Sequence, residues 1–599
     1  MLFLMVTWAG LILACLLIGA AMLNAVKADC FERIGDRFIV AVWLGVVILS
    51  VSLLAVSLVL PLSLLVGTGV IVSMTALALR LQRTRTDFRT LLSILSAKWI
   101  FGFITLEVVV AASAAQDITF FDTGLYHFQV IRWLSRFGAV PGLALIHNRF
   151  GFTSSWFALA APFNAGIFEA RIGSLTGGFA FLLATLHFFI CLSRIWQNQG
   201  LFEDWFIVIF SFLCLPTISL YGMPLSPSPD LPVIVLTGII VWINILLTKR
   251  KETDRSYLIN SQIIPLILSA GAVTIKLSAI PLLLVTSFFY LFEKRLSLRS
   301  IFMGCAIILL MMLPMLGFGI ITSGCPLYPS SLMCLDLPWS VGEKNAKVMS
   351  TIILNWARWL GPTPANANSW NWLGHWIKGE RAAFFLIICS VLSSVGISRL
   401  SNNIQAHIKK YIFILGGFGI TFMMYGAPSL RFGLGYFCIL PALLIAAYWN
   451  IISPFLVTAV TIILGTLIYT LWLGLSKTGL ALLGTTVIVS LIAWFYSRKK
   501  NNKNFLRVPL VLICLISLKF FLINSNKQQH FFLPPKLLTP NPTELIHRQT
   551  NDIKYVVSTV TAGEGQCWAA ELPCTPTLIP EDIKLRDPEG GIGKGFIRN

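Results

Sequence analysis

Long apolar runs, separated by short basic loops, recur along nearly the whole chain. Each run has about 17 to 25 residues, enough to cross the hydrocarbon layer of a membrane as an α-helix. The predicted spans lie at 2–26, 38–60, 61–79, 91–114, 169–193, 203–221, 229–248, 258–275, 277–292, 300–321, 382–400, 411–427, 431–449, 451–473, 479–497 and 508–524. Pro61 stands at a tight junction and Lys276 interrupts an apolar run, so the count is about 14 to 16. The pattern predicts an all-α, polytopic bundle of transmembrane helices.

Lysine and arginine are concentrated in the short loops. Five loops hold 19 of them in 46 residues; they lie at 80–90, 249–255, 294–299, 399–410 and 498–507. The three long polar segments hold 15 in 189 residues; they lie at 114–168, 322–380 and 525–599. Basic loops stay on the cytoplasmic side, so the long segments are predicted to face outward from the plasma (inner) membrane. The first run is read as a span with the N-terminus outside, because no basic segment precedes it.

The chain divides into a transmembrane part, 1–524, with outer loops 114–168 and 322–380, and a small extracytoplasmic tail, 525–599. Two cysteine pairs fall in these outward segments, Cys325 with Cys334 and Cys567 with Cys574. Thiols outside the cytoplasm persist as disulfides, so two short-range bridges are predicted. A zinc site is the rival interpretation, but neither pair has histidines at ligand spacing.

Composition narrows the class of function. Hydrophobic residues make up 56% of the chain and charged residues 12%, and the net charge is +20. The charge lies in membrane-flanking loops, so it indicates topology rather than a nucleic-acid partner. The chain has no GxxxxGK[ST], strand–GxGxxG–helix, HExxH or CxxC motif. ATP-driven, dinucleotide-linked and zinc-protease functions therefore lack their characteristic residues.

The stretch Gln116–Phe157, between two predicted spans, concentrates ionisable residues. They are Asp117, Asp122, His127, Arg132, Arg136, His147 and Arg149. Apolar residues recur at helical spacing over 128–136, which predicts an amphipathic helix in the membrane interface, ended by Gly138 and Pro141. Such a helix would hold Asp122, just before its start, near the outer leaflet. Ionisable groups beside a membrane span are candidates for function.

Transfer of a sugar from a polyprenyl-phosphate donor would use these groups. The reaction needs a base for the acceptor hydroxyl, cations for the departing phosphate and an apolar groove for the lipid. Asp122 is the candidate base. The candidate substrate- or phosphate-binding residues are His127, Arg132, His147, Arg149, Lys276 and Arg431.

The layout resembles the GT-C superfamily of integral-membrane glycosyltransferases, with a span, an acidic outer loop, an amphipathic helix and many further spans. FDTGLYHFQVIRW and VPGLALIHNRFGFTSSWF resemble a group of bacterial polytopic membrane proteins that carry DTGLYH and an HxRxGFxSSW-like motif. CPLYPS, APSLRFG and CWAAELPC match the same group. The resemblance implies a GT-C-like fold, a polyprenyl-phosphate sugar donor, and a glycan, lipid or protein acceptor.

By this resemblance the catalytic acidic position falls on Asp122, with Asp117 as an alternate or partner. GT-C proteins usually have two adjacent acidic residues, whereas here four residues separate Asp117 from Asp122. Many members of the superfamily use a divalent metal, and the departure leaves a metal open for this chain.

Each candidate also has a structural interpretation. Asp122 can be a helix N-cap, and Asp117 a solvated loop charge. His127 lies about 140° around an α-helix from Asp122, so it need not share its face. Lys276 and Arg149 can be interfacial cations. Five tryptophans of the second outer loop can stack on sugars or anchor the chain at the interface; they are Trp356, Trp359, Trp370, Trp372 and Trp376.

The sequence thus predicts a membrane glycosyltransferase that works on the extracytoplasmic face in cell-surface glycan assembly, with Asp122 as general base. Two other functions stay open. One is a glycan polymerase or ligase of the O-antigen type, which depends on arginines in outer loops. The other is a non-enzymatic transporter or flippase of lipid-linked sugars, for which internal repeats and broken helices are expected.

Overall fold

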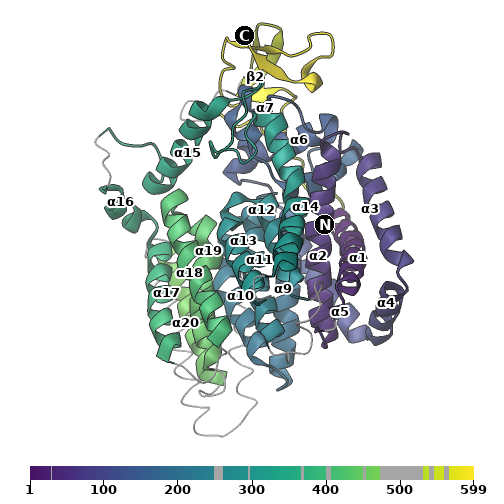
Figure 1. The fold of residues 1–599 in the computed structure, drawn as a ribbon, viewed down its shortest axis with the longest axis vertical. Helices are drawn as coiled ribbons and strands as arrows, with labels where there is room; N and C mark the ends of the chain where they lie inside the picture. The colour runs from purple at the N-terminus through teal and green to yellow at the C-terminus, as the bar shows by residue number, and fades with distance from the viewer. Residues whose placement is uncertain are drawn as a thin grey trace.

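The computed structural model describes residues 1–28, 30–248, 261–293, 297–365, 370–399, 406–448, 454–472, 530–537, 545–558 and 565–599, with Gly484 and Val487. Helices dominate this part of the chain (Figure 1). They are α1 Leu2–Ala25, α2 Ile34–Ser57, α3 Leu64–Arg80, α4 Gln82–Ile94, α5 Ala97–Ala114, α6 Phe128–Phe137, α7 Leu143–Ile146, α8 Ser155–Ala160, α9 Leu175–Trp196, α10 Phe202–Leu220, α11 Asp230–Thr248, α12 Ile263–Ile275, α13 Ile280–Glu293, α14 Leu298–Ser323, α15 Gly342–Trp359, α16 Trp372–Gly379, α17 Arg381–Arg399, α18 Ala406–Gly426, α19 Leu430–Ala447 and α20 Pro454–Trp472.

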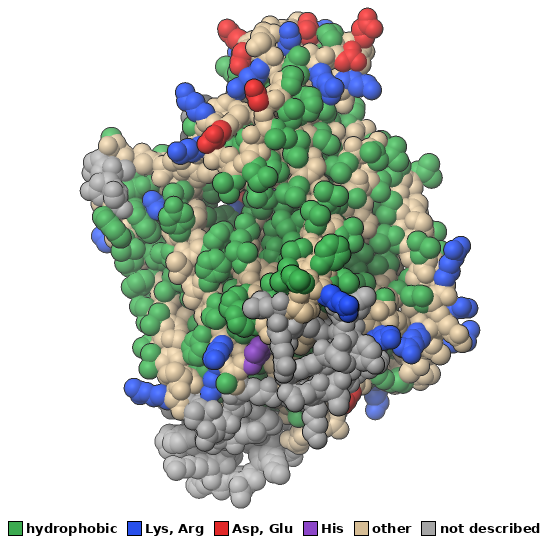
Figure 2. Space-filling model, viewed as in Figure 1, with side chains coloured by type: hydrophobic (Ala, Val, Ile, Leu, Met, Phe, Trp, Pro, Cys, Tyr) green, Lys and Arg blue, Asp and Glu red, His purple; other side chains and the backbone are tan. Residues whose placement is uncertain are grey.

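The described helices make this a multi-pass membrane protein. Ten of them are long and apolar enough to cross a membrane, or eleven if the bent pair α3–α4 counts as one span. Figure 2 shows hydrophobic side chains covering the flank of the bundle, with charged side chains gathered toward its two ends. The predicted helical bundle is therefore confirmed, with ten or eleven candidate spans among the described residues where the sequence predicted about 14 to 16. Each predicted span from 2–26 to 451–473 overlaps a helix, while 479–497 and 508–524 fall outside the described residues apart from Gly484 and Val487.

The predicted span 91–114 is interrupted in the structure. Its first residues, 91–94, end α4, a polar helix bent by 96° from α3, and the apolar helix α5 begins at Ala97. The sequence of α4, QRTRTDFRTLLSI, carries four ionised side chains, which are costly in hydrocarbon. The chain therefore turns across one end of the bundle before α5 begins.

Helix α2 connects the two ends of the bundle. At its start, Arg37 forms an ion pair with Asp87 of α4 at 2.8 Å, and we call this the basic end. At its finish, the carbonyl of Ser57 accepts a hydrogen bond from the N–H of Ala139 in the first outer loop, and we call this the loop end. Glycines let α1 pass close to α2: a Cβ on Gly19 would lie 1.7 Å from the carbonyl oxygen of Ala41. Small residues at such crossings are typical of membrane helices.

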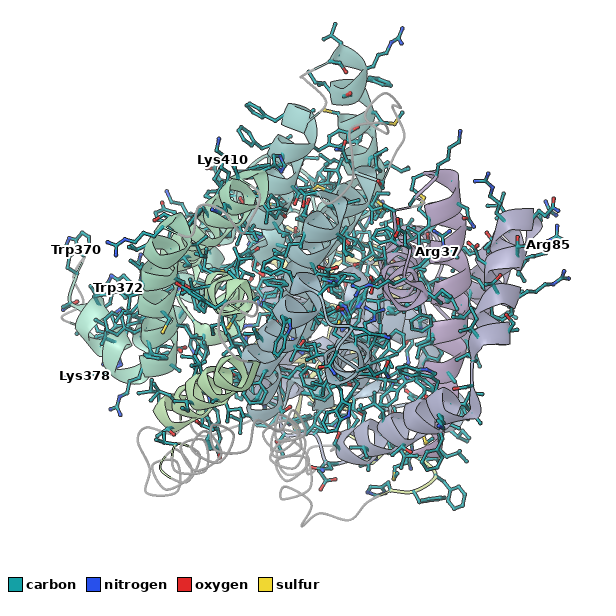
Figure 3. All side chains as sticks on the ribbon, turned by 90° about the horizontal axis from the view of Figure 1, so that it is seen from below. Arg37, Arg85, Trp370, Trp372, Lys378 and Lys410 are labelled. Carbon is teal, nitrogen blue, oxygen red and sulfur yellow. A yellow bond between two sulfur atoms is a disulfide. The ribbon has the colours of Figure 1, made fainter. Side chains whose placement is uncertain are left out.

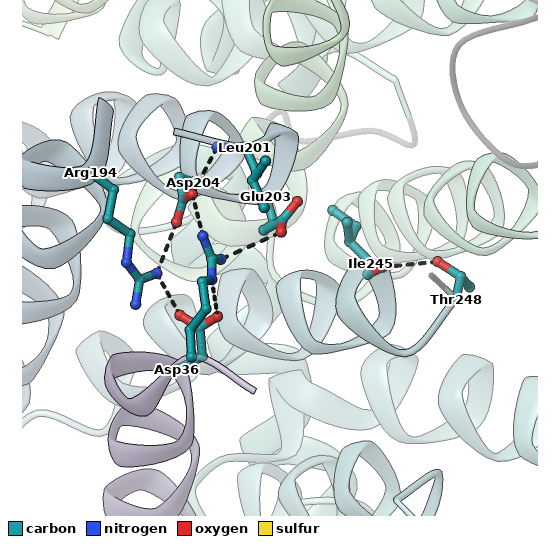
Figure 4. Close-up of polar contacts among 8 residues, drawn as sticks. Asp36, Arg194, Leu201, Glu203, Asp204, Ile245 and Thr248 are labelled. Carbon is teal, nitrogen blue, oxygen red and sulfur yellow. Dashed lines mark hydrogen bonds and ion pairs between the residues drawn. The ribbon is translucent and has the colours of Figure 1, made fainter. Parts of the chain in front are cut away.

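A buried ion-pair network fixes the basic end (Figure 4). Arg33 Nη1 lies 2.6 Å from Asp204 Oδ2, and Arg194 Nη1 lies 2.6 Å from Asp36 and 3.0 Å from Asp204. The aspartates stand in the first turns of α2 and α10, and Arg194 stands in the last turn of α9. The two aspartates and Arg194 therefore oppose the partial charges of their own helix ends, and the network joins three helices.

The tail adds strands that the all-α prediction did not include. In the described part, β1 Leu545–Thr550 pairs antiparallel with β2 Ile553–Ser558, which pairs parallel with β3 Cys574–Thr575. A second sheet pairs β4 Ile583–Leu585 with β5 Phe596–Arg598. Both cysteine pairs singled out above are disulfide-bonded, Cys325 to Cys334 and Cys567 to Cys574. The strands lie beyond the loop end of the bundle (Figure 1).

Candidate functional site

Four charged side chains meet at the loop end, and we call them the charge cluster: Asp122, Asp230, Lys276 and Arg431. Arg431 Nη2 lies 2.8 Å from Asp122 Oδ2, and its Nε lies 3.0 Å from Asp230 Oδ2. Lys276 Nζ forms a further ion pair with Asp230 Oδ1. Carboxylates and cations therefore alternate along one continuous chain of contacts. The sequence predicted Asp122, Lys276 and Arg431 as site residues, and the structure brings these three together.

All four charged residues lie at or beside helix ends, at the loop end of the bundle. Asp230 is the first residue of α11, and Arg431 is the second residue of α19. Lys276 lies in the short turn between α12 and α13, and Asp122 directly precedes the π-helix Thr123–His127. An arginine at a helix N-terminus is unfavourable beside the positive end of the helix dipole. The two carboxylates that contact Arg431 compensate for that position.

A further carboxylate supports the start of α19. Glu380 Oε1 accepts a hydrogen bond from the Ser429 hydroxyl at 3.0 Å, and Oε2 accepts one from the N–H of Leu430 at 3.3 Å. Both contacts satisfy groups at the helix N-terminus that have no partner within the helix. Glu380 is only 8% exposed, so it holds the backbone just before Arg431 in a fixed position.

The charge cluster remains open on one side. The side chains of Asp122 and Arg431 are each 17% exposed, and that of Lys276 is 26% exposed. The Arg431 guanidinium lies 4.6 Å from the ring centroid of Phe432, and Lys276 Nζ lies 3.8 Å from the same centroid. Aromatic faces attract both cations. A ligand can therefore reach the two cations, with an aromatic ring between them.

Electrostatics keeps Asp122 ionised. Burial alone would raise the pKa of its carboxyl, but the charge of Arg431 opposes this, with smaller contributions from His127 and Arg149. The net effect lowers the pKa of Asp122 below its ordinary value. Asp122 stands at the N-cap of the π-helix, yet its side chain makes no capping hydrogen bond. Its carboxylate faces Arg431 instead, so Asp122 is engaged in an ion pair rather than in capping the helix.

The π-helix changes the position of His127. With the wider turn of a π-helix, a residue five positions on lies nearer the face of the first than it does in an α-helix. His127 is buried, and burial lowers its pKa to about 4, so the ring is neutral near pH 7. Its Nδ1 lies 3.5 Å from the hydroxyl of Ser226, which is also 2.7 Å from the Thr123 hydroxyl. The separation of about 140° assumed an α-helix and is corrected by the π-helical turn.

The second half of the first outer loop is tied to the turn that carries Lys276. The Ser154 hydroxyl donates to the carbonyl of Ile275 at 2.8 Å, and the hydroxyls of Ser155 and Thr274 lie 2.9 Å apart. Arg149, in the same segment, contributes to the lowered pKa of Asp122. His147 is buried, which lowers its pKa to about 3. Arg149 therefore acts on the charge cluster by its charge, whereas His147 is held neutral.

Two predicted candidates lie away from the charge cluster. Asp117 is exposed and takes part in none of its ion pairs. Arg132 donates to the carbonyls of Ala569 and Ala570 in the tail, and pairs with Glu169 at 3.0 Å. Arg132 is thus engaged in holding the tail, and a phosphate role for it has no support in this geometry.

The predicted interfacial helix is instead buried. Helix α6 spans Phe128–Phe137 and is ended by Gly138 at φ 75°, as predicted, but residues 128–134 are all buried. Its polar side is covered by the tail, because Gln129 donates to the carbonyls of Trp568 and Ala570 at 2.9 and 3.0 Å. The amphipathic pattern therefore arises from two protein neighbours rather than from a lipid–water boundary.

The tail also forms hydrogen bonds with the backbone on both sides of Asp122. Gln566 Nε2 donates to the carbonyl of Phe121 at 2.8 Å, and the N–H of Trp568 donates to the carbonyl of Gly124 at 2.9 Å. The indole of Trp568 packs on Gly124, where an added Cβ would lie 2.3 Å from the ring. We call residues 566–570 the tail clamp. It fixes the path of the chain through Asp122.

We expect Gly124→Ala to destabilise the protein by about 1–3 kcal/mol, because overpacking a close contact forces the neighbours apart. Trp568 supplies that contact, so Trp568→Ala in the Gly124→Ala background should recover part of the loss. Thermal unfolding of the single and double variants in detergent measures both effects. Gly69→Ala is the matched control, since a Cβ there meets nothing within 4 Å. Equal stability of the two glycine variants would contradict the packing.

The five tryptophans of the second outer loop have different environments. Trp376 is buried, and its indole N–H donates to the carbonyl of Pro428, just before α19, at 2.6 Å. Trp372 is also buried and lies 4.8 Å from the Arg358 guanidinium. Trp370 and Trp356 are 77% and 49% exposed. Figure 3 shows Trp370 and Trp372 at the periphery of the bundle. Trp370 and Trp356 therefore present the largest exposed indole surfaces of these four tryptophans.

Sequence reasoning missed Asp230, which links the two cations of the charge cluster. Its signal was an acidic residue at the outer start of the predicted span 229–248, directly after Ser-Pro-Ser-Pro. Because successive predicted spans cross the membrane in alternating directions, the start of the span 229–248 was predicted to lie on the same side as Asp122. Among the described residues no group of three or more His, Cys, Asp or Glu is arranged to hold a metal ion.

Residues 1–438 match a family described as Domain of unknown function (DUF8201). The match covers the whole charge cluster and ends before the tail clamp. No curated protein and no solved structure matches the chain.

Proposed function

We propose that this chain, which belongs to the DUF8201 family, is an integral-membrane glycosyltransferase of GT-C type. It moves a sugar from a polyprenyl-phosphate donor to a glycan, lipid or protein acceptor outside the cytoplasm. The observation that carries the proposal is the charge cluster, in which a partly exposed carboxylate and two partly exposed cations meet at the loop end.

The cations suit the phosphate of the donor. Arg431 presents a planar guanidinium that can contact two oxygens of one phosphate, and Lys276 supplies a second positive charge. Both are neutralised by carboxylates in the absence of a ligand, which keeps the buried charges paired. A phosphate that contacts Arg431 competes directly with Asp122. Donor binding would therefore release the Asp122 carboxylate from its ion pair.

The released carboxylate has a clear role. Asp122 accepts the proton of the acceptor hydroxyl while the acceptor oxygen forms a bond to the anomeric carbon of the sugar. The bond between that carbon and the phosphate oxygen breaks, and the lipid phosphate leaves with both electrons. Arg431 and Lys276 neutralise the charge that develops on the leaving phosphate. Atoms and charge balance without an oxidant or reductant.

The extracytoplasmic location is testable by thiol labelling. We expect a membrane-impermeant thiol reagent to label Asp552→Cys, in the tail, in intact cells, because the basic loops hold the opposite end in the cytoplasm. Thr86→Cys, on α4 at the basic end, should react only after the membrane is permeabilised. Both residues are exposed, and the unsubstituted protein gives the background. The reverse labelling pattern would exclude an outward charge cluster.

The proposed reaction is tested by its product. Surface glycans and lipid-linked sugars are compared in cells with and without the gene, by mass spectrometry of both pools. Loss of the protein should remove a sugar from the acceptor and raise the amount of its lipid-linked donor. Unchanged glycans and unchanged lipid-linked sugars would reject the proposal.

A glycan polymerase or ligase is a second candidate, and the position of Arg431 favours it. Arg431 contacts both carboxylates of the charge cluster, as expected for a reaction that depends on an arginine in an outer segment. Activity that is lost in Arg431→Lys and kept in Asp122→Asn would select this alternative. Transport of a labelled lipid-linked sugar across vesicles without any covalent product would instead indicate a flippase.

A further inference from the structure

A large apolar cavity lies between α1, α2, α4, α5, α9 and α10, at a distance from the charge cluster. Its volume is about 1210 Å³, above the roughly 300–1,000 Å³ of ordinary small-molecule sites. The lining is mostly aliphatic and aromatic, and includes Leu13, Phe88, Trp99, Phe181 and Phe212. None of Asp122, Asp230, Lys276 and Arg431 lines it.

The bend between α3 and α4 creates this cavity. Asp87 of α4 is held by Arg37 and by the side-chain amide of Asn24, at 2.8 and 3.1 Å. The apolar side of α4, with Phe88 and Leu91, then faces the cavity. Helix α5 follows α4 and is only 22% buried, with Phe101 73% exposed. It stands at the edge of the bundle (Figure 1), and residues of α5 from Trp99 to Val110 line the cavity.

Polar and cationic residues occur at the basic end of the cavity. Arg194 and the exposed Gln197 and Gln199 line it there. Arg89 and Lys98 are exposed and adjoin the lining residues Phe88 and Trp99 in the sequence. Arg85 extends away from α4 at the same end (Figure 3). The apolar space therefore lies beside a cationic edge of the bundle.

These features point to one occupant. A cavity inside a membrane bundle whose walls are mostly aliphatic and aromatic favours hydrocarbon over water, because few groups in those walls can bind water. Cations near the end of the hydrocarbon layer attract anionic lipid headgroups. We propose that the cavity holds the acyl chains of an anionic membrane phospholipid, with its phosphate beside Arg89 and Lys98. This site is independent of the proposed glycosyl transfer.

Glycines provide a test of the acyl-chain site. Gly102 lines the cavity, and a Cβ there meets nothing within 4 Å, so Gly102→Trp fills space without a backbone clash. Gly69 on α3 has the same open surroundings and does not line the cavity, so Gly69→Trp is the matched control. Each full-length variant is purified into nanodiscs of phosphatidylcholine with phosphatidylglycerol. The phospholipid retained after transfer to detergent is then counted by native mass spectrometry.

We expect the unsubstituted protein and Gly69→Trp to retain phosphatidylglycerol. Displacing two methylenes, at about 0.8 kcal/mol each, weakens binding about ten-fold, so Gly102→Trp should lose it. Equal retention by Gly102→Trp and Gly69→Trp would overturn the site. Retention of phosphatidylcholine at the level of phosphatidylglycerol, or of added polyprenyl phosphate in preference to both, would overturn the assigned lipid.

The headgroup position has its own variants. Arg89→Glu with Lys98→Glu should reduce the retention of phosphatidylglycerol and leave that of phosphatidylcholine unchanged, because only the anionic headgroup is repelled. Lys410→Glu, at another exposed position on the same end (Figure 3), serves as the control and should bind as the unsubstituted protein does. An equal effect of both changes would show a general surface potential and would refute a defined headgroup site.

Discussion

We expect Asp122→Asn to abolish glycan modification while the protein stays in the membrane at its normal level. Asparagine keeps the size of the side chain but cannot accept the proton of an acceptor hydroxyl. Loss of a general base costs roughly 100- to 10,000-fold in rate. Arg431 keeps Asp230 as a partner in this variant, so the bundle retains a paired guanidinium. Surface glycan analysis of a deletion strain that expresses each variant measures the effect.

Asp117→Asn is the matched control for this experiment. It makes the same chemical change five residues away, in the same loop, at a position that is exposed and outside the charge cluster. We expect glycan modification at the level of the unsubstituted protein. Normal activity in Asp122→Asn would remove the assigned base, and loss of activity in Asp117→Asn would transfer that role to the other aspartate.

We expect Arg431→Met to destabilise the protein by about 3–5 kcal/mol, because it removes the cation shared by the partly exposed carboxylate of Asp122 and the buried carboxylate of Asp230. Asp122 loses the ion pair formed at 2.8 Å, and Asp230 keeps only Lys276. Methionine preserves most of the side-chain volume, so the loss of stability reflects the removal of the positive charge. Unfolding in detergent, followed by tryptophan fluorescence, compares this variant with the unsubstituted protein.

Two further variants define the cause of that loss. Arg136→Met removes an ion pair with Glu169 whose partners are 44% and 37% exposed, and we expect it to cost less than about 1 kcal/mol. Asp122→Asn added to Arg431→Met removes the stranded carboxylate and should recover part of the stability, as coupled neighbours do. Equal losses of stability in Arg431→Met and Arg136→Met would show that the ion pairs of the charge cluster stabilise the protein no more than an exposed pair does.

The helical framework follows from local sequence, and so could be predicted. Span length and hydropathy are properties of single segments, and the basic loops set their direction. Asp122, Lys276 and Arg431 could be chosen as candidates because each is ionisable and falls on the outer side of the predicted spans. Their contacts with one another and with Asp230 are shown only by the structure.

Other features of the site depend on contacts that no single segment reveals. The ion pair of Arg431 with Asp230 joins residues 201 positions apart, and the sequence around Asp230 does not predict this contact. The π-helical turn at Thr123–His127 occurs where the tail clamp holds the carbonyl of Gly124, which lies outside the local pattern. Arg132 has the charge of a phosphate ligand, yet tail carbonyls and Glu169 occupy its guanidinium. The hydropathy pattern cannot distinguish an arginine of the charge cluster, such as Arg431, from an arginine that holds the tail, such as Arg132.

The tail clamp also imposes an order on biosynthesis. Gln566 and its acceptor, the carbonyl of Phe121, are 445 residues apart in the chain. At about 5–20 residues per second, the ribosome makes the second partner some tens of seconds after the first. Until then the loop that carries Asp122 has no partner for this contact. The contacts that fix the path of the chain through Asp122 can therefore form only after translation has passed residue 566.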